Sequence, residues 1–275
     1  MTYALRSEGG LDYEICKYGT ARGQFRGPER MTDMPYVAVL GGNAAFGRFI
    51  AEPFPTLLER DLGQSVVNLG ALNASVDMYL NDPDLMKIAR GAEQVVVQIT
   101  GAHNLSNRFY KVHPRRNDRF IRASALLRSI YAELDFTEFH FTRHLLSGLY
   151  RTSPKRFGMI LDELRDAWVK RMELLMSQLD GQAVLLWMAD NGPEDRPNME
   201  LEESCGPLFV TRAMVEAVRP QARRYLEVLT PDMPRGGRTI GMIFGETETG
   251  AANRMLPVAT HAQAAKGLAA VLSAS

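Results

Sequence analysis

The sequence has few of the features that mark disulfide-rich, secreted or membrane-spanning proteins. Cys16 and Cys205 are its only cysteines, and they lie far apart with no CxxC pattern. A disulfide framework is therefore not indicated, and we expect two free thiols in a reducing compartment. No apolar run approaches the roughly 20 residues of a transmembrane helix, and residues 1–10 show no signal-peptide pattern. We expect a cytoplasmic protein with no membrane partner.

The sequence also lacks an excess of either charge. Lys and Arg together number 32, as do Asp and Glu, so the formal net charge is zero. This balance argues against a polycationic surface, and we expect no nucleic-acid partner. Apolar residues make up 45% and charged residues 23% of the 275 residues, the composition of a globular protein that buries a sizeable core.

Cofactor and metal motifs are missing as well. The glycines around residue 42 do not have the GxGxxG spacing of a dinucleotide site, and no GK[ST] follows Gly236-Gly237. His140 and His144 are four residues apart, a spacing that lets two imidazoles share a metal, but no HExxH surrounds them. We therefore expect no cofactor, and a packed helix is favoured over a metal site at these histidines.

What the sequence does contain is a regular alternation of short apolar runs with amphipathic segments. This alternation favours βαβ units, a parallel sheet covered on both faces and an α/β fold. Asn81-Asp82-Pro83 is expected to break one helical segment, 75–92, into two, and 262–272 is expected to form a terminal helix. The expected strands are residues 36–40, 65–69, 94–99, 183–188 and 224–229.

The division of the chain follows from the same pattern. Residues 1–35 are polar, glycine-rich and dotted with aromatic side chains, and we expect an arm that packs across the domain or onto a neighbouring subunit. Residues 11–18 have the composition of a short strand within it. Residues 36–275 are expected to form a single α/β domain. An insertion at about 105–180 is expected to cap the site with three helices, at 119–129, 137–150 and 154–179.

In parallel sheets, ligands bind at the carboxyl ends of the strands. The loops at those ends resemble the sequence blocks of the SGNH hydrolases, also called GDSL esterases. The matching segments are Gly41-Gly42-Asn43-Ala44-Ala45-Phe46-Gly47, Asn68-Leu69-Gly70, Gly101-Ala102-His103-Asn104 and Val258-Ala259-Thr260-His261. The resemblance implies a flavodoxin-like three-layer α/β/α fold with a five-stranded parallel sheet, and hydrolysis of acyl esters, often on carbohydrates. The chain also resembles a bacterial, largely alphaproteobacterial, family of unknown function.

The resemblance implies a site made of Asn43, Gly70, Asn104 and His261. His261 would be the base, and Gly70 and Asn104 would donate hydrogen bonds to the oxyanion. Asn43 stands where the family has its nucleophilic serine, and Val258 where it has the aspartate partner of the histidine. Attack would then come from water or a substrate hydroxyl. Two alternatives stay open: Asn43 as a helix N-cap, and His261 as a histidine that is solvent-exposed or lies at a helix N-terminus.

Residues 104–119 form the most basic stretch of the chain, with Asp118 as its one acid. Arginine side chains bind phosphate, sulfate or carboxylate groups through paired N–H donors. The alternative is a set of surface arginines paired with acids at 133–138. The expected anion-binding residues are Gly42, His103, Asn107, Arg108, Arg115, Arg116 and Arg119.

These features together predict a pocket for an anionic small molecule or carbohydrate ester. An esterase-type hydrolase without the usual serine nucleophile is one interpretation. The others are a sulfuryl or acyl transferase, a non-catalytic ligand-binding protein, and a structural protein that assembles into a homo-oligomer through the N-terminal arm.

Overall fold

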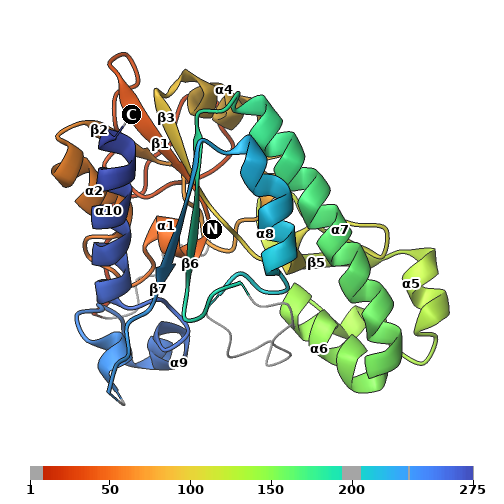
Figure 1. The fold of residues 1–275 in the computed structure, drawn as a ribbon. Coiled ribbons are helices and arrows are strands. Elements are labelled where there is room, and N and C mark those ends of the chain that lie inside the picture. Colours follow the sequence, from red (N-terminus) through yellow and green to blue (C-terminus); the bar gives the residue numbers. More distant parts are fainter. Residues whose placement is uncertain (1–8, 194–205, 235, 275) are drawn as a thin grey trace.

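The computed structural model describes residues 9–193, 206–234 and 236–274. At its centre is a five-stranded sheet in the order β2-β1-β3-β6-β7, in which all neighbouring strands are parallel (Figure 1). This is the flavodoxin-like strand order, so the expected α/β fold with a five-stranded parallel sheet is confirmed. The strands are β1 Tyr36–Leu40, β2 Ser65–Asn68, β3 Gln94–Gln98, β6 Ala183–Ala189 and β7 Arg224–Leu229.

Helices cover both faces of this sheet (Figure 1). On one face, α2 (Phe54–Leu62) and α10 (Val258–Ser273) pack on side chains such as Val37 and Val39 of β1. On the other face, the alternate residues of β1 pack beneath a second group of helices. Because successive side chains of a strand point to opposite faces, a strand between two layers must be apolar throughout. The second group comprises α3 Val76–Leu80, α4 Pro83–Gly91, α7 Pro154–Gln178 and α8 Arg212–Val218.

The break expected at residues 81–83 is present between α3 and α4. Asp82 caps α4, since its carboxylate accepts hydrogen bonds from the backbone N–H groups of Asp84 and Leu85. Pro83 occupies the first helical position, where its missing N–H costs nothing. The remaining short elements are α1 Asn43–Phe46, η1 Ala102–Asn104, η2 Phe136–Glu138, η3 Arg219–Gln221, η4 Gly237–Thr239, η5 Glu246–Glu248 and α9 Thr249–Ala252.

The insertion differs from expectation in its first part. The helix predicted over residues 119–129 is wrong in its first half, because β5 (Arg116–Ala123) pairs with β4 (Tyr110–His113) in an antiparallel hairpin, and a helix begins only at Ala125. Irregular register within this hairpin disturbs the period-two pattern by which a strand is recognised. The other helices of the insertion, besides α7, are α5 Ala125–Ile130 and α6 Thr142–Thr152.

Residues 9–35 lie against the domain. Phe25 is completely buried, and Arg26 donates hydrogen bonds to the backbone carbonyls of Gly47, Ile50 and Ala51. The strand expected at residues 11–18 is absent; Cys16 forms an isolated antiparallel bridge with Phe25 instead.

Two further expectations from the sequence concern the cysteines and membrane-spanning helices. Cys16 is partly buried, which raises the pKa of its thiol, and Cys205 lies outside the described residues. Within the described part of the chain, no helix combines the length and the apolar composition needed to cross a bilayer.

Candidate functional site

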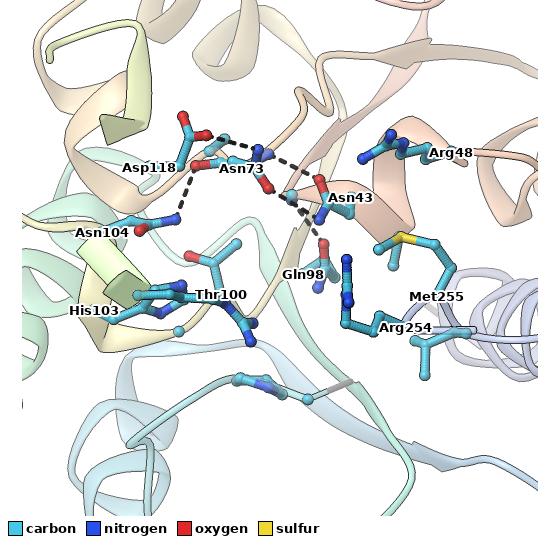
Figure 2. Close-up of a pocket in the computed structure, with 18 of the residues that line it drawn as sticks. Asn43, Arg48, Asn73, Gln98, Thr100, His103, Asn104, Asp118, Arg254 and Met255 are labelled. Carbon is cyan, nitrogen blue, oxygen red and sulfur yellow. Dashed lines mark hydrogen bonds between the residues drawn. The ribbon is translucent and has the colours of Figure 1, made fainter. Parts of the chain in front are cut away.

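A cavity of about 510 Å³ lies at the carboxyl ends of β1 and β3. The strand order reverses between these two strands, which is where ligands bind in open parallel sheets. The loops after both strands line it, as do Asn73, the β4–β5 hairpin, the start of α6 and residues 251–256 (Figure 2). Segments that are far apart in the sequence thus share one cavity.

Asn73 connects the polar side chains of this cavity. Its backbone N–H donates to Oδ1 of Asn43 over 2.8 Å, and Nδ2 of Asn43 donates back to Oδ1 of Asn73 over 3.2 Å. Asn104 Nδ2 donates to the backbone carbonyl of Asn73, and Asn73 Nδ2 donates to Oδ2 of Asp118, both over 3.2 Å (Figure 2). The backbone of Asn73 is left-handed, with φ +56°, a conformation that asparagine tolerates better than most residues. Residues in such conformations cluster at binding sites.

Neighbouring residues fix the orientation of two further polar groups. Thr142, completely buried at the start of α6, donates to Oδ1 of Asn104 over 2.6 Å. The backbone N–H of Gly42 donates to Oε1 of Gln98 over 2.8 Å. Because that N–H already donates to Gln98, the loop after β1 offers side chains rather than the Gly42 N–H to a ligand.

The β4–β5 hairpin brings a carboxylate to the cavity. Asn117 is completely buried, and its Oδ1 accepts hydrogen bonds from both the backbone N–H and the hydroxyl of Ser75. These bonds attach the hairpin to the loop before α3, beside Asn73. Asp118 follows and lines the cavity. Burial raises the pKa of its carboxyl, although Arg116 and Arg119 act to lower it.

His261 is 2% exposed and lines the cavity from α10. Its Nδ1 accepts a hydrogen bond from the backbone N–H of Phe54 over 3.1 Å. Burial lowers the pKa of His261 to about 3, with a smaller effect from the positive charge of Arg26. The ring is therefore neutral near pH 7, and because Nδ1 accepts, its proton lies on Nε2. Of the expected alternatives, a solvent-exposed histidine is wrong, whereas a position at a helix N-terminus is correct, since His261 lies in the first turn of α10.

His103 is a second neutral histidine of the cavity. It is 8% exposed, and its Nδ1 is buried without a hydrogen-bond partner among the described residues. Burial lowers the pKa of its imidazole well below the usual value, and the charge of Arg143 lowers it further. The structure therefore gives the cavity two histidines that carry no charge near neutral pH.

Positive charge comes to the cavity from three arginines on separate segments: Arg48 after α1, Arg143 on α6 and Arg254 after α9. Arg48 lies over the Phe49 ring, 4.5 Å from its centroid, and forms an ion pair with Glu248 at 3.5 Å. Asp118 is the one carboxylate among the described residues that line the cavity. The described lining therefore carries net positive charge.

Five of the residues expected at the site line this cavity: Gly42, Asn43, His103, Asn104 and His261. Asn43 is not the helix N-cap of the alternative interpretation, since Gly42 occupies that position and no side chain caps α1. Gly70 does not line the cavity. Its backbone N–H donates to Oδ1 of Asn68 over 2.9 Å.

The residues of the basic stretch lie elsewhere. Arg108 forms an ion pair with Glu163, and Oδ1 of Asn107 accepts hydrogen bonds from the backbone of its own loop. Arg119 stacks over Phe141 at the edge of the cavity, with its guanidinium carbon 5.3 Å from the ring centroid. Anion binding by this stretch stays a prediction, and none of the following lines the cavity: Asn107, Arg108, Arg115, Arg116 and Arg119. Among the acids of the alternative interpretation, Glu133 pairs with Arg156, and Asp135 accepts hydrogen bonds from Thr137.

Sequence reasoning missed Asn73, Asp118 and the three cavity arginines. The segment Ala71-Leu72-Asn73 follows the glycine at the end of β2, so its place at a strand end was a usable signal for Asn73. Arg48, Arg143 and Arg254 stand in no motif. Among the described residues, no group of three His, Cys, Asp or Glu side chains is placed to hold a metal ion. His144 lines the cavity with its ring against Phe139.

Two solved structures are similar to this chain. A lipase/acylhydrolase from Enterococcus faecalis has a TM-score of 0.41 and 11% identity, with 88% of this chain and 96% of that chain covered. The salicylyl-acyltransferase SsfX3 from a tetracycline biosynthetic pathway has a TM-score of 0.38 and 11% identity, with 87% of this chain and 55% of that chain covered. At these TM-scores neither likeness bears on what this chain does.

Comparison with curated proteins found no match. The family model described as "Domain of unknown function (DUF6473)" matches residues 1–275. Because the match extends over the whole sequence, the chain belongs to the DUF6473 family.

Proposed function

We propose that the protein binds a small anionic molecule in the cavity at the carboxyl ends of β1 and β3. The observation that carries this proposal is the charge of the described lining: three arginines from separate segments line a cavity in which Asp118 is the one carboxylate. A volume of about 510 Å³ suits a sugar-sized or somewhat larger ligand.

The way the polar groups are held supports binding. The Asn43, Asn73 and Asn104 amides hold one another in place, so little side-chain entropy is lost when a ligand arrives. Guanidinium groups can each give two parallel hydrogen bonds to a phosphate, sulfate or carboxylate. The amides can accept and donate to hydroxyl groups, which suits a polyhydroxylated anion such as a sugar phosphate or sugar acid.

The same geometry argues against an acyl-enzyme mechanism. An Asn43 amide has no proton to lose, and a His261 ring that carries its proton on Nε2 has its lone pair turned to Phe54. The backbone N–H of Gly70 is bonded to Asn68 and does not face the cavity. An ester hydrolase or a transferase working in this cavity would therefore use water or a substrate hydroxyl for the attack, with no covalent enzyme intermediate.

Isothermal titration at low ionic strength, with inorganic phosphate and glucose 6-phosphate as probes, tests the proposal. Arg254→Gln is expected to weaken binding about tenfold, since a charged hydrogen bond contributes about 1.5–3 kcal/mol. Arg115→Gln is the matched control, because both arginines are exposed and Arg115 lies outside the cavity.

Each contrary outcome has its own meaning. Loss of binding in Arg115→Gln with full binding in Arg254→Gln would transfer the anion site to the basic stretch. No binding of either probe to the wild-type protein would contradict the proposal.

A further inference from the structure

The carboxylate of Asp118 lines a positively charged cavity without a direct ion pair among the described residues, and Arg116 and Arg119 act on its charge only from beyond ion-pair distance. It accepts a hydrogen bond from the neutral amide of Asn73, and no Lys, Arg or His of the described chain forms an ion pair with it. Arg119, the next residue, stacks over Phe141 instead. A carboxylate that is partly removed from water without a cation is costly to keep ionised.

The position of Asp118 is fixed by the fold. The residue before it, Asn117, is completely buried and bonded twice to Ser75, so β5 cannot turn the carboxylate away without breaking these bonds. Asn73 Nδ2 holds the carboxylate from the cavity side. A surface acid with no role in binding needs no such anchoring.

Two of the three cavity arginines lie apart from this carboxylate. Figure 2 shows Asp118, Asn104 and His103 on one side of Asn43, and Arg48 and Arg254 on the other. Arg143 acts on His103 and so belongs to the side of Asp118. A ligand that fills the cavity therefore meets the one carboxylate of the described lining on one side of Asn43 and two arginines on the other.

We propose that the ligand carries an ammonium group, which pairs with Asp118, and an anionic group, which pairs with Arg48 and Arg254. The ligand class is thus an aminated small-molecule acid or phosphate, such as an amino sugar phosphate. This inference rests on the proposed function, since it uses the same arginines for the anion. An ammonium supplies the direct ion pair that Asp118 makes with no described residue, which a hydroxyl in the same place would not.

The test uses two pairs of probes that differ only in an amine replacing a hydroxyl. The pairs are glucosamine 6-phosphate with glucose 6-phosphate, and 2-aminoethyl phosphate with 2-hydroxyethyl phosphate. By calorimetry, the aminated member of at least one pair is expected to bind about tenfold more tightly to the wild-type protein. Asp118→Asn is expected to remove this preference while it retains binding of the hydroxylated member.

The test variant and its control make the same change from aspartate to asparagine, one inside the cavity and one outside it. Asparagine keeps an oxygen for the hydrogen bond from Asn73, so Asp118→Asn removes the charge with little change of volume. Asp162→Asn removes an exposed carboxylate on α7 outside the cavity, and it should keep the amine preference. Thermal unfolding of each variant confirms that it is folded before binding is compared.

The outcomes separate this inference from the proposed function. If both members of each pair bind equally, or if the amine preference survives Asp118→Asn, the inference is overturned while the anion site stands. If inorganic phosphate binds but no aminated probe does up to about 10 mM, the inference is likewise overturned. If neither phosphate nor any probe binds, the proposed function itself fails.

Discussion

The backbone N–H of Phe54 donates a hydrogen bond to Nδ1 of His261 over 3.1 Å, joining the start of α2 to the first turn of α10 across 207 positions. An N–H donor needs a lone pair, so Nδ1 is unprotonated and the neutral ring carries its proton on Nε2. His261 is the residue that the SGNH resemblance implies as a base. In this tautomer its Nε2–H is a hydrogen-bond donor, and its lone pair on Nδ1 is already used. A hydrogen-bond donor at this place can contact an anion directly.

The tautomer is open to direct measurement. In a long-range ¹H–¹⁵N spectrum at pH 7, His261 is expected to show a protonated Nε2 and an unprotonated Nδ1. Burial lowers its pKa to about 3, so these signals should stay constant down to about pH 5. A titration of His261 with a midpoint near 6.5 would contradict the assignment.

Acid should destabilise the protein through this same ring. The pKa of His261 is about 3 in the folded chain and about 6.5 in the unfolded chain, so between these values only the unfolded state binds the proton. The contribution of His261 to the free energy of unfolding should therefore fall by about 1.4 kcal/mol for each pH unit below about 6.5, and the buried His103 adds a fall of the same sign.

Urea titrations at several pH values measure this effect. The fall is expected to be shallower in His261→Asn, which keeps an acceptor for Phe54 N–H without a titrating ring. The exposed His140→Asn should match the wild type. Equal slopes in all three proteins would show that His261 is not the group responsible.

Replacing Asn43 with serine should not create an esterase. Asn43→Ser supplies a hydroxyl where the SGNH hydrolases, which the sequence resembles, have their nucleophile, but the Nε2 proton of His261 leaves no lone pair to accept from it. Hydrolysis of p-nitrophenyl acetate should match that of the wild type, with His261→Ala in each background as the control. A His261-dependent gain would instead identify a hydrolase scaffold that lacks its nucleophile.

Two substitutions at Asn73 should together reveal the cost in stability of its left-handed backbone. Both Asn73→Gly and Asn73→Ala remove the side-chain bonds to Asn43 and Asp118. Alanine also keeps a Cβ at φ +56°, so the alanine variant should be less stable than the glycine variant by about 1 kcal/mol. Urea denaturation measures the difference, and an alanine variant of equal or higher stability would refute the explanation.

Arg26 should be the most costly arginine to replace in residues 9–35. It is 7% exposed and donates to three carbonyls of the loop between α1 and α2, and its burial lowers the pKa of the guanidinium to about 10. Arg26→Met is expected to lower the free energy of unfolding by about 3 kcal/mol, because buried carbonyls lose their donors. Arg60→Met removes an exposed ion pair with Glu52 and should cost less than about 1 kcal/mol.

The parallel sheet could be predicted because its strands are buried on both faces. Residues 37–40 and 95–97 are continuous apolar runs, and a loop follows each of the two strands. Because ligands bind at the carboxyl ends of parallel strands, these loops were expected to line the site. Asn43 and Asn104 could be predicted as site residues from their positions in these loops. Cytoplasmic location, a bacterial source and assembly through the arm stay predictions.

The rest of the site depends on contacts that leave no local pattern. Residues 116–123 form a strand because β4 pairs with them, and their many charges hide the period-two pattern. Residues 108–119 contain several arginines, which made this stretch a candidate for anion binding. Of these residues, only the acid Asp118 lines the cavity. Arg48, Arg143 and Arg254 converge only through tertiary folding, which spacing along the chain does not encode.

The wall formed by residues 251–261 comes after all five strands of the central sheet in the sequence. During synthesis, β1, β3 and the hairpin leave the ribosome well before α10, so the cavity stays open on one side until α10 packs on the sheet. A ligand held between Asn43 and this wall therefore binds only chains in which α10 has been made and has packed. Its binding free energy stabilises the state in which α10 is packed and does not stabilise shorter folding intermediates.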